Sequence, residues 1–171
     1  MKVRAFQSLL TLALSISMAQ IALADDADTL REMRDRAEIE ALMWRYVRAL
    51  DTFDPDAYVS VFTEDGQFGA GENATKGRAA LRAMVAGLRD GREERAAQGE
   101  TLAPLQHVIA NTWLEFVSAD EALLHSYWMT LGGSTGAGTT PNVLAAGRGI
   151  DHLVRVDGQW LISIRDVAPE D

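Results

Sequence analysis

The chain has no cysteine, and this absence removes several kinds of chemistry at once. A disulfide framework, a cysteine nucleophile and a thiolate metal site are all excluded. Only 3 histidines occur in 171 residues, which leaves room for one catalytic histidine but disfavours a histidine-rich metal cage. Basic residues are also in the minority, 16 against 25 acidic, and the net charge is −9. Because phosphate binding needs clustered Lys and Arg, this charge argues against nucleic acids and anionic membranes as partners.

What remains is the composition of an ordinary globular domain. Hydrophobic residues make up 47% of the chain and charged residues 24%, which argues against a disordered protein. The length fits one domain, large enough to bury a core without disulfides or structural metals.

The N-terminus has the pattern of a secretory signal peptide. Two basic residues precede an apolar stretch at residues 9–23, and small residues follow the A-x-A pattern at residues 22–24. An uncleaved anchor is the alternative, but the stretch is shorter than the ~20 apolar residues of a membrane span. We therefore predict a signal peptide at residues 1–24, a domain at 25–171, and a periplasmic or secreted protein with no membrane partner after cleavage.

Apolar residues recur at helical spacing in the N-terminal half of the domain. Residues 29–50 are predicted to form one long helix, and residues 77–97 another. Between them, Asp54 and Pro55 have the pattern of an N-cap and first residue of a short helix that carries Tyr58, Val61 and Phe62. The stripe of the first helix consists of Leu30, Met33, Ala37, Leu42, Tyr46 and Leu50.

The C-terminal half is predicted to form strands joined by turns. Turn residues at 63–66 precede a short strand that opens at Gln67 and Phe68. The longer strands are expected at 106–117, 122–131, 142–156 and 159–167, with a flexible loop at 132–141 and a tight hairpin at 157–158. Helices followed by an antiparallel meander indicate an α+β fold, in which a bent sheet wraps over the helices and encloses a cone-shaped apolar pocket.

Tyr46, Asp51 and His107 are the main candidates for catalysis. Tyr46 lies on the apolar stripe, and Asp51 lies where that stripe ends. A carboxylate at a helix C-terminus is unfavourable for the helix dipole and invites a cationic partner, such as a histidinium. His107 lies near the start of an apolar strand, and an Asp51–His107 pair would form a base with its orienting carboxylate.

Simpler roles for both residues stay open at this point. Asp51 could bond to nearby backbone N–H groups and cap the next turn. A single histidine on a strand is more often a satisfied core or edge residue than a base. Spacing in the sequence does not decide between these roles.

Strand pairing argues against a metal site. If one hairpin joins the two central strands, His107 pairs near Gly132 and His125 pairs near Leu114, so the two histidines lie roughly 20 Å apart. His152 has a single neighbouring carboxylate. We predict neither a metal nor another cofactor.

Arg165 is a single basic residue in the otherwise apolar last strand. It either points to solvent or points inward and binds an anion or a leaving group. Alternation does not decide, because one bulge would reverse the face.

Several segments in a fixed order resemble a known family. Residues 35–62 read DRAEIEALMWRYVRALDTFDPDAYVSVF, followed by TEDGQF; residues 106–120 read QHVIANTWLEFVSAD; residues 155–165 read RVDGQWLISIR. This set resembles the SnoaL-like branch of the nuclear-transport-factor-2-like superfamily. It is most similar to the group of scytalone dehydratase, hexachlorocyclohexane dehydrochlorinase and bile-acid 7α-dehydratase, and it covers nearly all of the domain.

The resemblance implies a cystatin-like α+β barrel with a conical pocket and cofactor-free elimination of water or HCl. It places the family's Asp–His dyad on Asp51 and His107, a pocket tyrosine of the bile-acid enzyme on Tyr46, and a pocket arginine on Arg165. The second histidine and the Ser/Asn pair of scytalone dehydratase fall at glycines here, so that enzyme's substrate does not carry over.

These observations lead to a cofactor-independent lyase, of dehydratase or dehydrohalogenase type, that acts on a small apolar or cyclic substrate. His107, held by Asp51, would remove a proton; Tyr46 would donate a hydrogen bond, and Arg165 would stabilise negative charge. The candidate pocket walls are Tyr58, Phe62, Phe68 and Trp128.

Three alternatives stay open. The same residues could serve an isomerase or a cyclase, since each reaction begins with proton abstraction. The domain could be a non-catalytic module that binds a ligand or a protein partner. It could also be the small subunit of a ring-hydroxylating dioxygenase, although the export signal argues against this.

Related enzymes are commonly dimers or trimers built on the outer face of the sheet, so a homo-oligomer is expected. Trp113, Leu114 and Phe116 share one strand and must offer apolar groups to both of its faces.

Overall fold

The structure, a computed structural model, describes residues 2–134, 136 and 140–170, and for residues 2–25 the backbone alone. The chain divides into two compact units, Met1–Glu38 and Ile39–Asp171. Helix α1 (Lys2–Asp51) occupies the described part of the first unit and continues into the second. It starts well before the predicted residue 29, because the preceding segment is rich in the strong helix formers Ala and Leu.

Not all of the predicted apolar stripe on α1 is buried. Leu42 and Tyr46, in the second unit, are buried, whereas Leu30 and Met33, in the first, are exposed. Among the described residues, no helix has an apolar stretch long enough to cross a membrane.

Local sequence explains the other two helices. Helix α2 (Pro55–Ser60) begins as predicted: Asp54 caps it by accepting hydrogen bonds from the backbone N–H groups of Asp56 and Ala57 at 3.0 and 2.9 Å. Helix α3 (Arg78–Ala97) follows Gly77, whose φ of 80° suits a residue without a Cβ. Its buried side chains are Leu81 and Val85, whereas Leu88, predicted on the same side, is 51% exposed.

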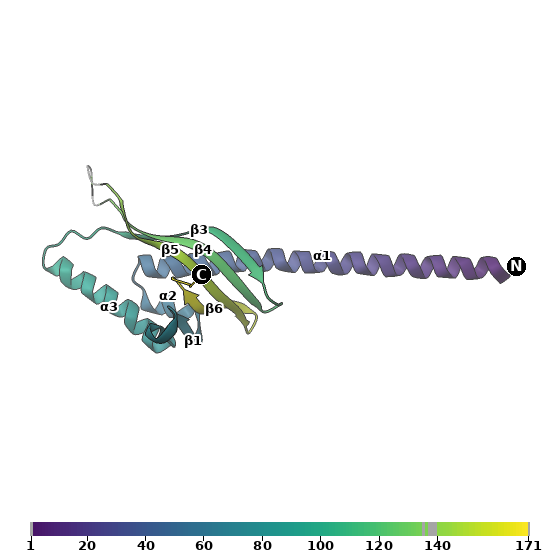
Figure 1. Cartoon of the computed structure of the whole chain (residues 1–171), viewed down its shortest axis with the longest axis horizontal. Helices are drawn as coiled ribbons and strands as arrows, with labels where there is room; N and C mark the ends of the chain where they lie inside the picture. Colours follow the sequence, from purple (N-terminus) through teal and green to yellow (C-terminus); the bar gives the residue numbers. More distant parts are fainter. Residues whose placement is uncertain (1, 135, 137–139, 171) are drawn as a thin grey trace. The chain divides into compact units, whose positions relative to one another are not determined.

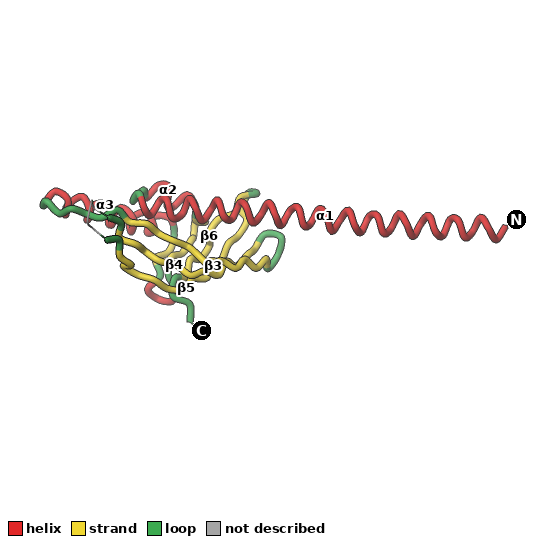
Figure 2. The backbone as a smooth tube through the Cα atoms, turned by 90° about the horizontal axis from the view of Figure 1, so that it is seen from above, coloured by secondary structure: helices red, strands yellow, loops and turns green. Residues whose placement is uncertain are grey.

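Six strands form one curved sheet that does not close (Figures 1 and 2). Their order is β2-β1-β6-β5-β4-β3, and all neighbours are antiparallel except β1 and β6, which run parallel. The predicted α+β fold is confirmed, with this one parallel pair as an addition. The strands are β1 (Phe62–Phe68), β2 (Thr75–Lys76), β3 (Leu105–Phe116), β4 (Glu121–Gly132), β5 (Asn142–Val156) and β6 (Gln159–Asp166), and a short 3₁₀ helix, η1 (Gly71–Asn73), precedes β2.

Strand β1 contains the residues that the sequence predicts as a turn. Its pairing with β6 shifts between Phe62 and Gln67, so residues 63–66 form an irregular segment inside the strand. Gly66 is needed there, because a Cβ at this position would lie 2.8 Å from the Cβ of Phe62. The prediction that Phe62 lies on the short helix is wrong: α2 ends at Ser60, and Phe62 is the first residue of β1.

The β5–β6 hairpin is the clearest success of local prediction. Asp157 and Gly158 have φ angles of 50° and 79°, the left-handed conformation that a two-residue hairpin turn requires. Strand β5 has the predicted bounds. In the predicted loop at 132–141, Gly132 is the last residue of β4, and residues 135 and 137–139 lie outside the described residues.

The predicted register between β3 and β4 is wrong by one or two residues. His107 pairs with Thr130, and His125 pairs with Trp113. The register shifts between Ala110 and Trp113, where Asn111 has a φ of 49° and the strand bulges by one residue. The rows of the two histidines still lie six residues apart along β3, about 20 Å, which is too far for both to bind one ion.

Alternation along β4 and β5 defines the inner face of the sheet. Leu124 pairs with Asp151, and Ser126 pairs with Gly149; all four residues are buried. Helix residues 39–49, α2 and α3 supply the other half of the hydrophobic core. The buried core residues are Ile39, Leu42, Met43, Tyr46, Val47, Ala49, Tyr58, Val59, Val61, Phe62, Leu81, Val85, Ala122, Leu124, Leu153, Trp160 and Ile162.

Candidate functional site

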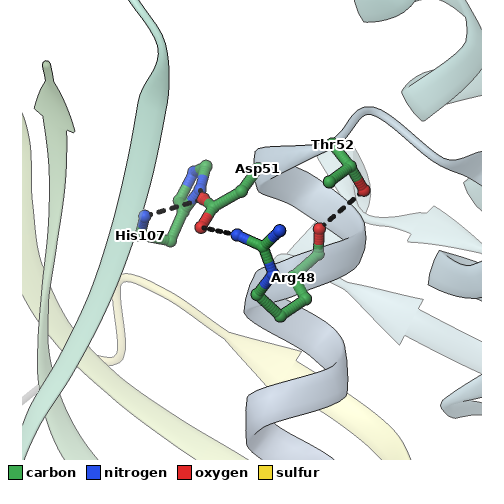
Figure 3. Close-up of polar contacts among 4 residues, drawn as sticks. All are labelled: Arg48, Asp51, Thr52 and His107. Atoms are coloured by element: carbon green, nitrogen blue, oxygen red, sulfur yellow. Dashed lines mark hydrogen bonds and ion pairs between the residues drawn. The ribbon is translucent and has the colours of Figure 1, made fainter.

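Asp51 and His107 lie in contact, although 56 residues separate them in the chain. Asp51 is the last residue of α1, and His107 is the third residue of β3 (Figure 3). Both side chains are largely covered, with 10% of Asp51 and 22% of His107 exposed. The sequence prediction that the two residues meet is therefore fulfilled in geometry, while their catalytic role stays a prediction.

One carboxylate oxygen of Asp51 holds both the main chain and the ring of His107. Asp51 Oδ1 accepts a hydrogen bond from the His107 backbone N–H at 2.9 Å, and the His107 Nδ1 atom lies 2.8 Å from the same oxygen. The second oxygen, Oδ2, lies 3.7 Å from Arg48 Nη1, one helical turn earlier. Arg48 thus supplies part of the positive charge that a carboxylate at a helix C-terminus needs.

This arrangement assigns the proton on the histidine ring. A carboxylate only accepts hydrogen bonds, so Nδ1 of His107 must carry the hydrogen. In neutral His107 the other nitrogen, Nε2, then has a free lone pair and is the atom able to take a proton from a substrate. Within the described residues, Nε2 has no hydrogen-bond partner.

A second polar cluster surrounds Arg165, and it is much more deeply buried. The guanidinium of Arg165 forms an ion pair with Asp151, and the exposed side-chain fractions are 3% and 0%. Arg165 also lies over the ring of Tyr46, 4.5 Å from the ring centroid. The structure therefore settles the question that alternation left open: Arg165 points inward.

Aromatic rings enclose this cluster. Tyr46, Tyr58 and Phe62 pack against one another in tilted and edge-to-face arrangements, with centroid distances of 5.1 to 6.2 Å. Burial raises the pKa of both tyrosines above the ordinary value, and the positive charge of Arg165 opposes this rise. Both tyrosines therefore keep their protons near neutral pH.

The charges of the buried pair depend on each other. Burial raises the pKa of the Asp151 carboxyl, and the neighbouring guanidinium opposes that rise. Burial lowers the pKa of Arg165, but Tyr46 and Asp151 outweigh it and raise the pKa above its ordinary value. Five buried side-chain atoms have no hydrogen-bond partner among the described residues, and three of them belong to this cluster: Tyr58 Oη, Asp151 Oδ1 and Arg165 Nε.

Asp151 is the residue of this cluster that sequence reasoning missed. In the sequence it is only a neighbour of His152, whereas in the sheet it pairs directly with Arg165 across β5 and β6. The available clue was an acidic residue two positions before Leu153, on the same alternating face of the strand as that apolar side chain. A buried acid on one strand calls for a basic partner, and Arg165 is the only basic residue of β6.

The predicted pocket walls divide into two groups. Tyr58 and Phe62 are fully buried in the core, and Phe68 packs against that core and pairs with Arg165. Trp128 is half-buried on the same face of the sheet as His107, because it pairs with Ile109, two residues further along β3. Its indole N–H donates to the carbonyls of Arg148 and Val167 at 2.9 and 3.0 Å.

Tyr46 connects the two clusters through α1. It lies five residues before Asp51, which corresponds to a rise of about 7.5 Å along the helix. Along β5, by contrast, six residues separate Asp151 from Ala145, which pairs with Thr130 in the row of His107. Over the described part of the chain, no three His, Cys, Asp or Glu side chains come together in a way that could hold a metal ion.

Comparisons with known proteins agree with this architecture. Residues 31–166 match the SnoaL-like domain family. No curated protein matches the chain. Among solved structures, an NTF2-like protein with a cystatin-like fold from Novosphingobium aromaticivorans is 25% identical with a TM-score of 0.66, and covers 85% of this chain and 88% of its own.

Two further solved structures are similar over most of their length. A candidate scytalone dehydratase from Novosphingobium aromaticivorans is 26% identical with a TM-score of 0.63, covering 81% of this chain and 85% of its own. ActVI-ORFA from Streptomyces coelicolor is 25% identical with a TM-score of 0.62, covering 78% of this chain and 95% of its own. With the family match spanning most of the chain and the fold shared with these structures, this protein belongs to the SnoaL-like domain family of the NTF2-like superfamily.

Proposed function

We propose that this protein is a cofactor-independent lyase, of dehydratase or dehydrohalogenase type, acting on a small apolar or cyclic molecule. The observation that carries the proposal is the contact of 2.8 Å between Asp51 Oδ1 and His107 Nδ1. It leaves Nε2 of His107 as a base that is already oriented before substrate binds. One similar structure is a candidate dehydratase, which supports the reaction class.

In the proposed reaction, His107 Nε2 takes a proton from a carbon next to an activating group. The electron pair of the broken C–H bond forms a double bond as the neighbouring hydroxyl or halide leaves with its own bonding pair. A departing hydroxyl receives a proton from the His107 imidazolium and leaves as water, whereas after loss of a halide the imidazolium releases its proton to solvent. Asp51 stabilises the imidazolium that forms on His107, since its carboxylate is already within hydrogen-bond distance.

Tyr46 and Arg165 would act together on developing negative charge. The Tyr46 hydroxyl keeps its proton because burial raises its pKa, so it can donate a hydrogen bond to a carbonyl or a leaving oxygen. Arg165 is bound by Asp151 and lies over Tyr46, and it would act through this ring.

The direct test is a turnover screen of small cyclic alcohols, ketones and halides with three proteins: wild type, His107→Ala and His125→Ala. His125 is a matched control, because it lies on the neighbouring strand and has one carboxylate partner at 3.9 Å. We expect wild type and His125→Ala to turn over the same substrate and His107→Ala to lose at least about 100-fold in rate. Full activity of His107→Ala would exclude the mechanism.

The products separate the related functions. Loss of water or halide identifies a lyase, whereas a rearranged product of unchanged composition identifies an isomerase or a cyclase. Saturable binding of an apolar ligand without turnover of any compound identifies a binding module.

Export and self-association complete the proposal. We expect the mature protein to begin at Asp25 after signal cleavage, which N-terminal sequencing of the protein from its producing cell checks. We also expect a dimer or a trimer through the outer face of the sheet, where Trp113 and Tyr127 are 68% and 53% exposed. Sedimentation of a Trp113→Asp variant tests this: a mass equal to that of wild type argues against this face.

A further inference from the structure

Arg92 of helix α3 contacts two segments that lie far apart in the chain. Its guanidinium lies over the ring of Phe53, 4.7 Å from the ring centroid. Its Nη2 atom donates a hydrogen bond of 2.9 Å to the carbonyl oxygen of Ala103. The side chain is half-buried, so both contacts are partly shielded from water.

Each of these segments carries one member of the dyad. Phe53 lies two residues after Asp51, and Ala103 lies four residues before His107. The contacts therefore close a ring: Asp51 to Phe53 along the chain, Phe53 to Arg92 to Ala103 through space, Ala103 to His107 along the chain, and His107 back to Asp51 through its hydrogen bonds.

Phe53 is held in an unfavourable backbone conformation within this ring. Its φ of 53° lies in the left-handed region, which is uncommon for a bulky residue without a special reason. Hydrogen bonds of its own backbone N–H to Leu50 at 3.1 Å and of the Asp54 N–H to Ala49 at 2.9 Å fix the turn. The guanidinium over the Phe53 ring adds a third constraint from outside the turn.

We propose that Arg92 is a positioning residue, which holds the turn after α1 and the segment before β3 at the separation that lets Asp51 bind His107. Arg92 acts through Phe53 and Ala103, and it touches neither member of the dyad in the contacts described here. Its catalytic consequence rests on the proposed function, but its effect on the Asp51–His107 contact does not.

Arg89 offers a matched control on the same helix. It is an arginine three residues before Arg92, and its partners are the carboxylates of Asp90 and Glu93 on α3 itself. Arg89→Gln therefore removes the same charge and the same kind of side chain without a link to either dyad segment.

The experiment measures hydrogen exchange of two protons of His107, the backbone N–H and the ring Nδ1–H, by NMR on protein with ¹⁵N-labelled histidine. We expect Arg92→Gln to speed exchange of both by about tenfold, which corresponds to ~1.4 kcal/mol. Phe53→Leu should speed exchange by a similar factor. In the double variant the exchange rates should be less than twofold above those of the faster single variant, because both substitutions remove the same contact between Arg92 and Phe53. Arg89→Gln should leave both rates within twofold of wild type.

Two results would overturn the proposal. One is an exchange rate of the His107 protons in Arg92→Gln within twofold of wild type. The other is an equal increase at the backbone N–H groups of His125 in β4 and His152 in β5, which carry the same label; it would show that Arg92 supports only global stability. Once a substrate is known, kcat in Arg92→Gln should fall more than KM rises. Lost turnover with unchanged exchange of the His107 protons would show that Arg92 does not act by positioning the dyad. Faster exchange in Arg92→Gln, in a protein whose wild type turns over no compound, would refute the proposed function and leave the positioning role intact.

Discussion

The two polar clusters of this protein differ in how far their charged groups are buried. The Asp51–His107 pair remains partly exposed at the end of a helix, and one nitrogen of the ring is left without a partner in the described structure. The Arg165–Asp151 pair is buried in the core, with the guanidinium over the ring of Tyr46. In the proposed reaction the first pair exchanges a proton with the substrate, whereas the second pair is buried and has no such exchange.

This contrast has an energetic side. Burying a charge away from water raises the free energy of the folded state, and only the attraction of a buried counter-charge offsets this rise. Breaking the Arg165–Asp151 pair should therefore lower stability most, and breaking the partly exposed Asp51–His107 pair should lower activity most. Variants that separate these two quantities test the contrast.

The largest stability effect is expected from Asp151→Asn. This change leaves the guanidinium of Arg165 buried without a counter-charge, and we expect the free energy of unfolding to fall by about 3–5 kcal/mol. Urea denaturation followed by circular dichroism measures it. The double variant Asp151→Leu/Arg165→Met should recover most of the loss, and a double variant as unstable as Asp151→Asn would contradict this account.

Asp51→Asn is the matched variant at the partly exposed Asp51–His107 pair. The amide oxygen can still accept the hydrogen bond from the His107 backbone, so we expect a loss of about 1–2 kcal/mol in unfolding free energy. A loss as large as that of Asp151→Asn would remove the distinction between the two clusters.

The buried tyrosines predict a specific pH dependence. Burial raises the pKa of Tyr46 and Tyr58 in the folded state, so their contribution to stability is fully present below pH 10 and is lost as the pH rises further, when the tyrosines of the unfolded chain ionise. Each should reduce the free energy of unfolding by about 1.4 kcal/mol per pH unit above pH 10. Urea denaturation between pH 9 and 11.5 measures the slope.

Single Phe substitutions isolate this effect. Tyr46→Phe and Tyr58→Phe should each remove about half of the tyrosine slope, because each removes one ionisable group. Equal slopes in wild type and in both variants would show that the alkaline loss of stability comes from other residues.

Gly147 tests the region between the two clusters. A Cβ at this position would lie 2.7 Å from Cζ2 of Trp128, so Gly147→Ala must displace the indole from its place near the His107 row. We expect a loss of about 1–3 kcal/mol and a change in near-UV circular dichroism. Gly91→Ala on α3 is the control, because a Cβ there meets no atom within 4 Å.

The smallest effect is expected at the cap of α2, where Asp54 contacts backbone N–H groups and neither charged pair. Asp54→Ala removes two hydrogen bonds at the start of α2 and should cost about 1 kcal/mol in unfolding free energy. Asp54→Asn, which keeps an accepting oxygen, should recover most of it. Thermal denaturation measures both.

Features that depend on a few neighbouring residues could be predicted from the sequence. The cap at Asp54 and the hairpin at Asp157–Gly158 follow from side-chain chemistry and left-handed backbone preferences within four residues. The end of α1 at Asp51 also follows from its local pattern.

Features that depend on register could not be predicted with the same accuracy. A bulge at Asn111 shifts the partner of His107, and another irregularity between His152 and Leu153 precedes the row in which Asp151 meets Arg165. A sequence does not reveal how many residues a bulge inserts, so the face of Arg165 stayed open and its partner was missed. The Asp51–His107 contact was foreseen from chemistry and resemblance, because a carboxylate at a helix end needs a partner that only the tertiary fold supplies.

The central claim is that Asp51 and His107 work as one unit in proton transfer. The most direct measurement is kcat/KM for wild type, Asp51→Asn, His107→Ala and the double variant on the substrate found by screening. We predict that each single change lowers kcat/KM at least about 100-fold, and that the double variant is no more than a few-fold worse than His107→Ala. Near-wild-type kcat/KM in either single variant, or losses that multiply in the double variant, would contradict the account.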